Sequence, residues 1–234
     1  QGAKAKKSMA RAKAIEQRQT AAIEEKSKLL KNIERSDTLK IIQTPYHTKR
    51  LVELKNVTIA YGQEPVCGPV SFTIQQGDRI ALQGANGSGK SSILKLICGQ
   101  EIPYAGEFWR GNGLKISYVS QDTSNLRGSL SDLARDSGIE ESLFLAMLAK
   151  LDVPKVQMEK DMSSLSAGQK KKVLLAKSIC EPAHLHIWDE PMNYLDVISR
   201  MQIEELLIQF QPTILFVEHD RAFCENVATE IVSL

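Results

Sequence analysis

A glycine-rich octapeptide at residues 84–91 carries a pattern that binds phosphate. It reads Gly-Ala-Asn-Gly-Ser-Gly-Lys-Ser and fits GxxxxGK[ST], a loop whose backbone N–H groups cradle phosphates. Lys90 would reach the β and γ phosphates of a nucleotide, and the Ser91 hydroxyl would bind a bridging Mg²⁺ ion. A glycine-rich turn without a ligand is the alternative. The residues expected to contact the nucleotide are Gly84, Asn86, Gly87, Ser88, Gly89, Lys90, Ser91 and Ser92.

Two adjacent carboxylates end a short apolar run, Leu-His-Ile-Trp-Asp-Glu, at residues 185–190. A triphosphate site needs a second metal anchor and a group that orients the attacking water. We expect Asp189 to hold Mg²⁺ and Glu190 to act as the general base. The alternative is an acidic strand end that caps the next helix; Pro191 directly after the acids and the phosphate loop upstream favour the metal site.

Short β-like runs precede and lead into the phosphate loop. They cover residues 51–62, 70–77 and 79–84, and each ends in glycine. Strands then alternate with helical stretches, which indicates an α/β domain. The expected helices lie at residues 91–98, 140–151, 167–180 and 195–210.

The composition describes a globular protein with an uneven distribution of charge. Of 234 residues, 42% are hydrophobic and 25% charged, which excludes a collagen, a coiled-coil rod and a wholly disordered chain. Residues 1–50 contain 13 Lys and Arg against 5 acidic residues, whereas the rest contains 17 against 23. Such a division predicts an arm that meets nucleic acid or an acidic surface, attached to a domain with another role.

The basic arm has the composition of a helix. Residues 1–40 contain no Pro and no Gly after Gly2, and are rich in Ala, Lys, Glu, Arg and Gln. They predict one long helix with a thin apolar stripe, which Pro45 follows. Its basic beginning would contact nucleic acid or an acidic surface; in the alternative the basic side chains are merely solvated and the helix packs on the domain or its neighbour.

The cysteines and the apolar runs both point to a cytosolic protein. The four cysteines lie 31, 82 and 44 residues apart, with no CxxC pair and no His at zinc-like spacing, so we expect reduced thiols. Apolar runs such as 213–217 are far shorter than the roughly 20 residues that span a membrane, so we expect no membrane insertion and a cytoplasmic location. Because the chain begins with Gln1, we expect it to be cut from a longer polypeptide.

A further motif, Leu-Ser-Ala-Gly-Gln at residues 165–169, lies between the loop and the carboxylates. With it, the chain resembles the nucleotide-binding domains of the ATP-binding cassette (ABC) superfamily, whose signature is LSGGQ. The resemblance implies a P-loop NTPase fold of ABC type, with an antiparallel β-subdomain and a helical subdomain, and ATP with Mg²⁺ as cofactor. It also implies that Tyr61 stacks on adenine, that Gln121 lies near Mg²⁺ and the water, and that His219 contacts the γ-phosphate. Taken singly, each of these three could be an ordinary packing or structural residue.

The same resemblance implies that a second nucleotide-binding domain is a partner. In this superfamily the signature of one domain covers the ATP bound to another, so one domain does not complete a site alone. Ser166, Gly168 and Gln169 would act in trans, either on a second domain of the same full-length chain or in a homodimer. A helix that begins at Ser166 would offer free N–H groups to a γ-phosphate.

Two branches of the superfamily compete, namely membrane transporters and the ABC-F proteins that enter the ribosome. Residues 189–196, DEPMNYLD, resemble the ABC-F sequence DEPTNHLD, and 218–223, EHDRAF, resemble SHDRxF. Only 44 residues separate Gln121 from Leu165, which is short beside a transporter's helical subdomain. The basic arm is similar to the returning helix of the ABC-F linker, which implies the ribosome and its RNA as partners. The ATP-binding subunit of a transporter is the alternative.

Within ABC-F, the chain resembles the antibiotic-resistance proteins of the Lsa-like group, which protect ribosomes from drugs. The resemblance implies the C-terminal half of such a protein, with residues 1–48 as a helical linker segment and 49–234 as the second nucleotide-binding domain. Ala167, Met192 and Tyr194 depart from the general family pattern.

The remaining prominent residues have simpler interpretations. We expect the three lysines at 170–172 to form a solvated helix face, with contact to nucleic acid or a partner as the alternative. His184 and His186 are expected at a strand edge rather than on a metal. The expected core aromatics are Trp109, Trp188, Phe216 and Phe223.

Overall fold

The computed structural model describes residue 41, residues 43–62 and residues 64–234, and the part from 41 onward is one compact unit. The predicted helix over residues 1–40 lies outside the described residues. The predicted α/β fold with an antiparallel β-subdomain and a helical subdomain is confirmed.

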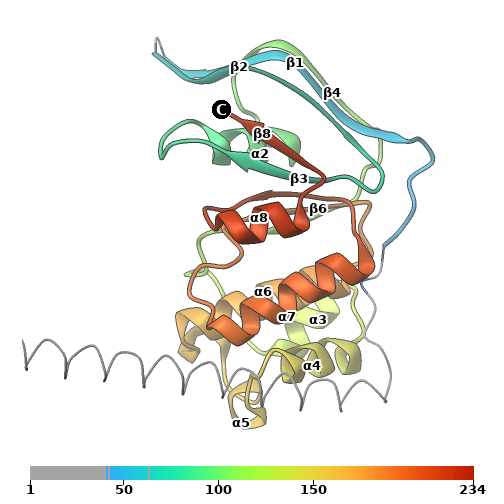
Figure 1. Cartoon of the computed structure of the whole chain (residues 1–234). Helices are drawn as coiled ribbons and strands as arrows, with labels where there is room; N and C mark the ends of the chain where they lie inside the picture. The colour runs from blue at the N-terminus through green and yellow to red at the C-terminus, as the bar shows by residue number, and fades with distance from the viewer. Residues whose placement is uncertain (1–40, 42, 63) are drawn as a thin grey trace, which may run out of the picture. The chain divides into compact units, whose positions relative to one another are not determined.

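A three-stranded antiparallel sheet forms one layer (Figure 1). It consists of β1 (Arg50–Tyr61), β2 (Glu64–Gln75) and β4 (Tyr104–Arg110), with β1 in the middle. The β-branched and aliphatic residues of β1 and β2 are typical of strands, and many of them are buried in the core.

A five-stranded parallel sheet forms the second layer, in the order β5-β6-β7-β3-β8. Both faces of a parallel sheet are covered, so its inner strands are largely apolar, and every residue of β6 and β7 is buried, His186 and Asp189 included. Val217 is the register partner of both Asp189 and Leu82, which brings the ends of three strands to one edge. The strands are β3 (Arg79–Gln83), β5 (Ile116–Val119), β6 (Leu185–Asp189), β7 (Ile214–Val217) and β8 (Glu230–Ser233).

Helix α2 (Lys90–Ile97) lies between the two sheets, and its side chains Ile93 and Leu94 are fully buried in their shared core. Three helices cover the opposite face of the parallel sheet. They are α6 (Ala167–Cys180), α7 (Val197–Phe210) and α8 (Arg221–Val227).

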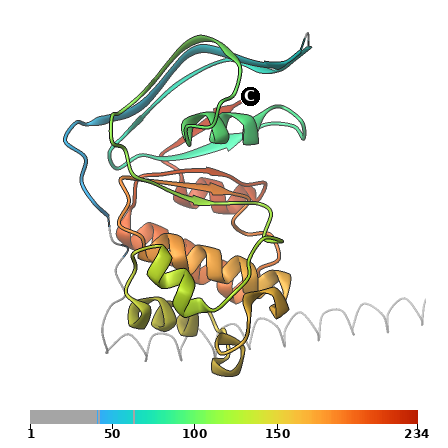
Figure 2. The ribbon, with the colours of Figure 1, turned by 180° about the vertical axis from the view of Figure 1, so that it is seen from behind.

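The helical subdomain lies beyond α6 and is seen best from behind (Figure 2). It joins the end of β5 to the beginning of α6 and packs mainly through α4 on α6. Its elements are α3 (Leu130–Asp136), α4 (Glu141–Lys150), α5 (Lys155–Met158) and the 3₁₀ turn Met162–Ser164.

Polar side chains fix where the site-bearing helices begin. At α6, Ser166 and Gln169 form a capping box, in which each side chain accepts a hydrogen bond from the other's backbone amide. At α7, Asp196 accepts from the Ser199 amide at 2.9 Å. The sequence predicted α6 with its observed limits, and predicted α7 two residues too early because Asp196 is its cap.

Three expectations about side chains were wrong. Lys171 and Lys172 are buried rather than solvated, because this side of α6 faces the sheet and the segment before α7. His186 lies inside the inner strand β6 and is 1% exposed, so burial lowers its pKa to about 4. Trp109 is 39% exposed on the antiparallel sheet, where the Arg50 guanidinium lies 4.5 Å from its ring centroid. The other predicted core aromatics are buried, namely Trp188, Phe216 and Phe223.

Candidate nucleotide-binding site

The phosphate loop connects β3 to α2, as the sequence predicted. Gly89 has φ +87° and caps the helix, a left-handed conformation that glycine adopts readily. The Lys90 ammonium is buried and donates to the carbonyl oxygens of Gly84 and Ala85, both at 2.8 Å. The lysine is thus folded back along its own loop, at the amino end of α2 where anions are favoured.

Ser88 provides a direct test of whether the loop fits phosphate. Its hydroxyl oxygen is buried and has no hydrogen-bond partner among the described residues. A buried hydroxyl without a partner is costly, so a ligand that accepts its hydrogen bond would be favoured. A Cβ on Gly84 would lie 2.5 Å from that oxygen, so glycine keeps the space beside it open. Together with Lys90, these groups suit a phosphate.

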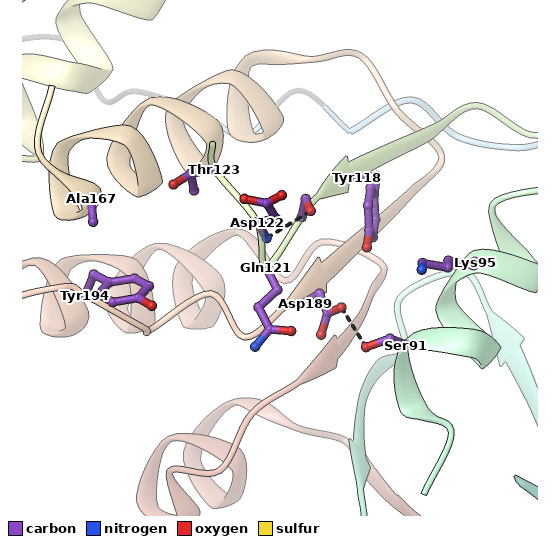
Figure 3. Close-up of a pocket in the computed structure, with 10 residues that line it drawn as sticks. Ser91, Lys95, Tyr118, Gln121, Asp122, Thr123, Ala167, Asp189 and Tyr194 are labelled. Atoms are coloured by element: carbon purple, nitrogen blue, oxygen red, sulfur yellow. Dashed lines mark hydrogen bonds between the residues drawn. The ribbon is translucent and has the colours of Figure 1, made fainter. Parts of the chain in front are cut away.

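The two predicted metal ligands meet at the edge of the sheet. The Ser91 hydroxyl donates to Asp189 Oδ2 at 3.0 Å (Figure 3). Burial raises the pKa of Asp189, so a cation beside it would stabilise its charged form. Within the described part of the chain, no group of three or more His, Cys, Asp or Glu side chains could hold a metal. The pair therefore suits Mg²⁺, which takes few protein ligands and keeps water and phosphate oxygens.

Glu190 stands at the centre of a cluster of predicted catalytic residues. Gln121 Nε2 donates to Glu190 Oε2 at 2.9 Å, and His219 Nε2 lies 3.5 Å from Glu190 Oε1. Asn193 Nδ2 also donates to Oε2. Two loops far apart in the sequence, after β5 and after β7, thus each bring a side chain to a carboxylate that the loop after β6 carries.

The backbone of Glu190 is held in an uncommon conformation. Its φ is +49°, in the left-handed region that non-glycine residues seldom occupy. The Glu190 amide donates to the Val217 carbonyl at 3.0 Å, so pairing with β7 stabilises this turn. The turn directs the carboxylate away from the strand and toward Gln121.

The signature segment is open at its helix start. Ser166 is exposed, and Gly168 is so close to the segment before α7 that a Cβ there would lie 2.7 Å from Tyr194 O. A pocket of about 470 Å³ extends from Ser91 and Asp189 past Gln121 to Ala167 and Tyr194, as Figure 3 shows. The signature and the phosphate loop therefore line opposite ends of this pocket.

Tyr61 ends β1 and is half exposed, and its hydroxyl donates to Ser92 Oγ at 3.1 Å. This contact holds the tyrosine beside the first turn of α2, with part of the side chain free to meet a ligand. Asn86 lies exposed on the phosphate loop.

Two buried charges near the site were missed by sequence reasoning. Glu218 was overlooked although it directly precedes His219. It stands where the ABC-F pattern SHDRxF has Ser. Lys171 was overlooked because a run of three lysines is typical of a solvated face. One signal could have identified Lys171. It lies at helical spacing from Leu175 and Ile179, two apolar residues on the buried side of α6.

Comparison with known proteins identifies the family. Residues 67–193 match the family model described as ABC transporter. The chain belongs to the ABC transporter family. It is an ATP-binding domain of that family, and we refer to it below as the cassette.

The cassette has relatives among curated bacterial proteins. It is 32% identical over 215 residues to ATP-binding protein Uup of Buchnera aphidicola, covering 88% of the cassette and 36% of that protein. It is 35% identical over 192 residues to ribosome protection protein VmlR of Bacillus subtilis, covering 79% of the cassette and 34% of VmlR. The cassette thus spans about a third of the length of these relatives.

A solved structure confirms the predicted P-loop fold of ABC type. The dimeric structure of MJ0796, a bacterial ABC transporter cassette, superposes with a TM-score of 0.68 at 23% identity, covering 79% of the present chain and 94% of that chain. In the described residues of our cassette, no helix is both long enough and apolar enough to cross a membrane.

A pair of glycine substitutions tests the conformation of the phosphate loop. A Cβ on Gly89 would lie 2.3 Å from Cys67 Cβ, whereas a Cβ on Gly77, at φ +90°, meets nothing within 4 Å. We predict that Gly77→Ala costs only backbone strain of about 1 to 2 kcal/mol. Gly89→Ala should cost more and should abolish ATP binding. Urea unfolding and fluorescent nucleotide titration would measure both; equal stability and unchanged binding in the two variants would contradict the packed loop.

Proposed function

We propose that this cassette hydrolyses ATP, with Glu190 as the general base for the attacking water. The observation that carries the proposal is the convergence of Gln121, Asn193 and His219 on the Glu190 carboxylate. A general base must lie within hydrogen-bond reach of the water, and neighbours that fix its position raise its efficiency. Gln121 and His219 would exchange their present contacts with Glu190 for contacts with the water and the γ-phosphate.

The remaining polar groups would bind the triphosphate. Lys90 would turn from its two carbonyl partners to the β and γ phosphates, and Ser88 would donate its unpartnered hydroxyl. Ser91 and Asp189 would hold Mg²⁺, with Gln121 close by; when bound, the ion neutralises developing charge on the phosphates. Tyr61 would stack on the base.

We further propose that the site is completed by a second cassette. Ser166 is exposed at the start of α6, and Gly168 and Gln169 lie in its first turn. Backbone amides at a helix start favour an anion, so this end suits a γ-phosphate offered by a partner. The dimeric state named for the MJ0796 cassette supports the arrangement.

For the whole protein, we propose an ABC-F factor that acts on the ribosome in the cytoplasm and confers antibiotic resistance in the manner of the Lsa-like group. The similarity to VmlR, which is named a ribosome protection protein, and the DEPMNYLD and EHDRAF segments support this proposal. The compact helical subdomain between Gln121 and Leu165 also supports it over a transporter subunit. Residues 49–234 would be the second, C-terminal nucleotide-binding domain of that protein, preceded by the basic linker segment of residues 1–48.

The general-base role is tested by Glu190→Gln. The amide keeps the shape of the side chain but cannot take a proton, so we predict a fall in turnover of about 10² to 10⁴. ATP binding should be retained, since Lys90 and Ser91 are unchanged. Phosphate release at high cassette concentration measures turnover, and Glu205→Gln on the exposed face of α7 is the matched control. Parental turnover in Glu190→Gln would refute the role.

The ribosome proposal is tested through the five basic residues Lys4, Lys6, Lys7, Arg11 and Lys13. If they neutralise RNA phosphates, replacing them with Gln should weaken ribosome binding and flatten its dependence on salt, by about 0.7 to 0.9 in log–log slope for each lost contact. Co-sedimentation with a non-hydrolysable ATP analogue, between about 50 and 200 mM salt, would measure this.

The matched control for that experiment replaces exposed lysines of the helical subdomain, Lys150, Lys155 and Lys160, with Gln. The control should keep the parental slope. If both variants keep the parental affinity and slope, the basic segment does not contact RNA. Absence of any ribosome binding by the parent, together with membrane segments in the same polypeptide, would favour the transporter alternative.

A further inference from the structure

Lys171 is a fully buried lysine in the second turn of α6. Its ammonium donates to the carbonyl oxygen of Ser120 at 3.0 Å and approaches that of Asp189 at 3.5 Å. Ser120 directly precedes Gln121, and Asp189 directly precedes Glu190. One side chain therefore holds the backbone on which two of the converging catalytic residues are carried.

Glu218 is a buried residue whose carboxylate holds backbone by accepting hydrogen bonds from two amides. Its Oε1 accepts from the His219 amide at 2.8 Å, and its Oε2 accepts from the Met192 amide at 3.1 Å. Met192 directly precedes Asn193. Glu218 therefore holds the backbone beside Asn193 and at His219, the other two residues that contact Glu190. Glu218 is only 5% exposed.

The two side chains hold the same loop. Lys171 approaches the Asp189 carbonyl, and Glu218 accepts from the Met192 amide, three residues farther along the chain. Removing one member of a group of buried charges leaves the others uncompensated, which is strongly destabilising locally. Because protein interiors have a low dielectric constant, such groups fix their surroundings more firmly than surface pairs do.

We propose that Lys171 and Glu218 are coupled positioning residues that set the backbone around the hydrolytic centre. Neither acts on nucleotide or water; Lys171 positions Gln121 and Glu190, and Glu218 positions Asn193 and His219. The proposal rests on the hydrolytic function proposed for Glu190, and it adds that turnover depends on two buried charges outside the phosphate loop.

The test uses Lys171→Met, Glu218→Gln and the double variant of the cassette, with the half-buried Lys170→Met as matched control. Amide hydrogen exchange by mass spectrometry would follow three segments, residues 116–124, 186–193 and 216–222. We expect Lys171→Met to accelerate exchange in all three, including the Glu218 segment, whose backbone Lys171 does not hold. Glu218→Gln should likewise accelerate exchange at 116–124. This second variant decides the question if Lys171→Met does not fold.

Kinetics supply the second readout. A misplacement of catalytic groups by about 1 Å costs about 10²-fold in rate, so turnover should fall by that order while ATP affinity stays parental. The double variant should lose less than the product of the two single losses, because the charges are coupled. The proposal would be overturned if accelerated amide exchange stayed within the mutated element. It would also be overturned if the turnover loss of the double variant equalled the product of the two single losses. If Glu190→Gln turns over normally, the hydrolytic role fails, whereas the exchange experiment still decides whether the two charges position these loops.

Discussion

Parallel pairing of β7 with both β6 and β3 is the constraint on which the candidate site depends. Val217 pairs with Asp189 on one side and Leu82 on the other, so these strands end at the same level. The chain that leaves each strand then carries a different function: the phosphate loop after β3, Glu190 after β6 and His219 after β7. Ligands of open α/β sheets bind at this carboxyl edge, and here the register alone brings the separate motifs within contact distance.

The interior of the cassette is more polar than the sheet pattern suggests, and the polar groups are concentrated between α6 and β6. The Ser178 hydroxyl accepts from Trp188 Nε1 at 2.8 Å and lies 3.2 Å from His186 Nδ1. Nearer the start of the same helix, Lys171 approaches the backbone carbonyl of Asp189 at the end of β6. Buried polar groups tolerate few alternative arrangements. They therefore fix α6, which begins with the signature, against the strand that ends in Asp189.

Sequence reasoning was strongest where local chemistry decides the structure. The phosphate loop, the helix from Ala167 to Cys180 and the strand ending at Asp189 follow from glycine spacing, a capping serine and an apolar run. The sequence also predicted that Gln121 and His219 belong with Glu190, through family resemblance rather than through geometry. It missed Lys171 because the run of three lysines outweighed the spacing of Lys171 from Leu175 and Ile179. It could not predict Glu218 or the burial of His186, because burial there is decided by which neighbours pack against the end of β7 and against β6. The seven-residue strand β4 was missed because its mostly exposed residues give little apolar alternation.

The hydrolytic site proposed around Glu190 requires the signature of a second cassette to complete it. The most direct measurement is the specific ATPase activity of the isolated cassette across a dilution series, with nucleotide binding measured in parallel. If two cassettes share the site, activity per molecule rises with cassette concentration, while ATP affinity at the phosphate loop changes little. A high specific activity that stays constant on dilution would show a complete site in one molecule and would contradict the shared site.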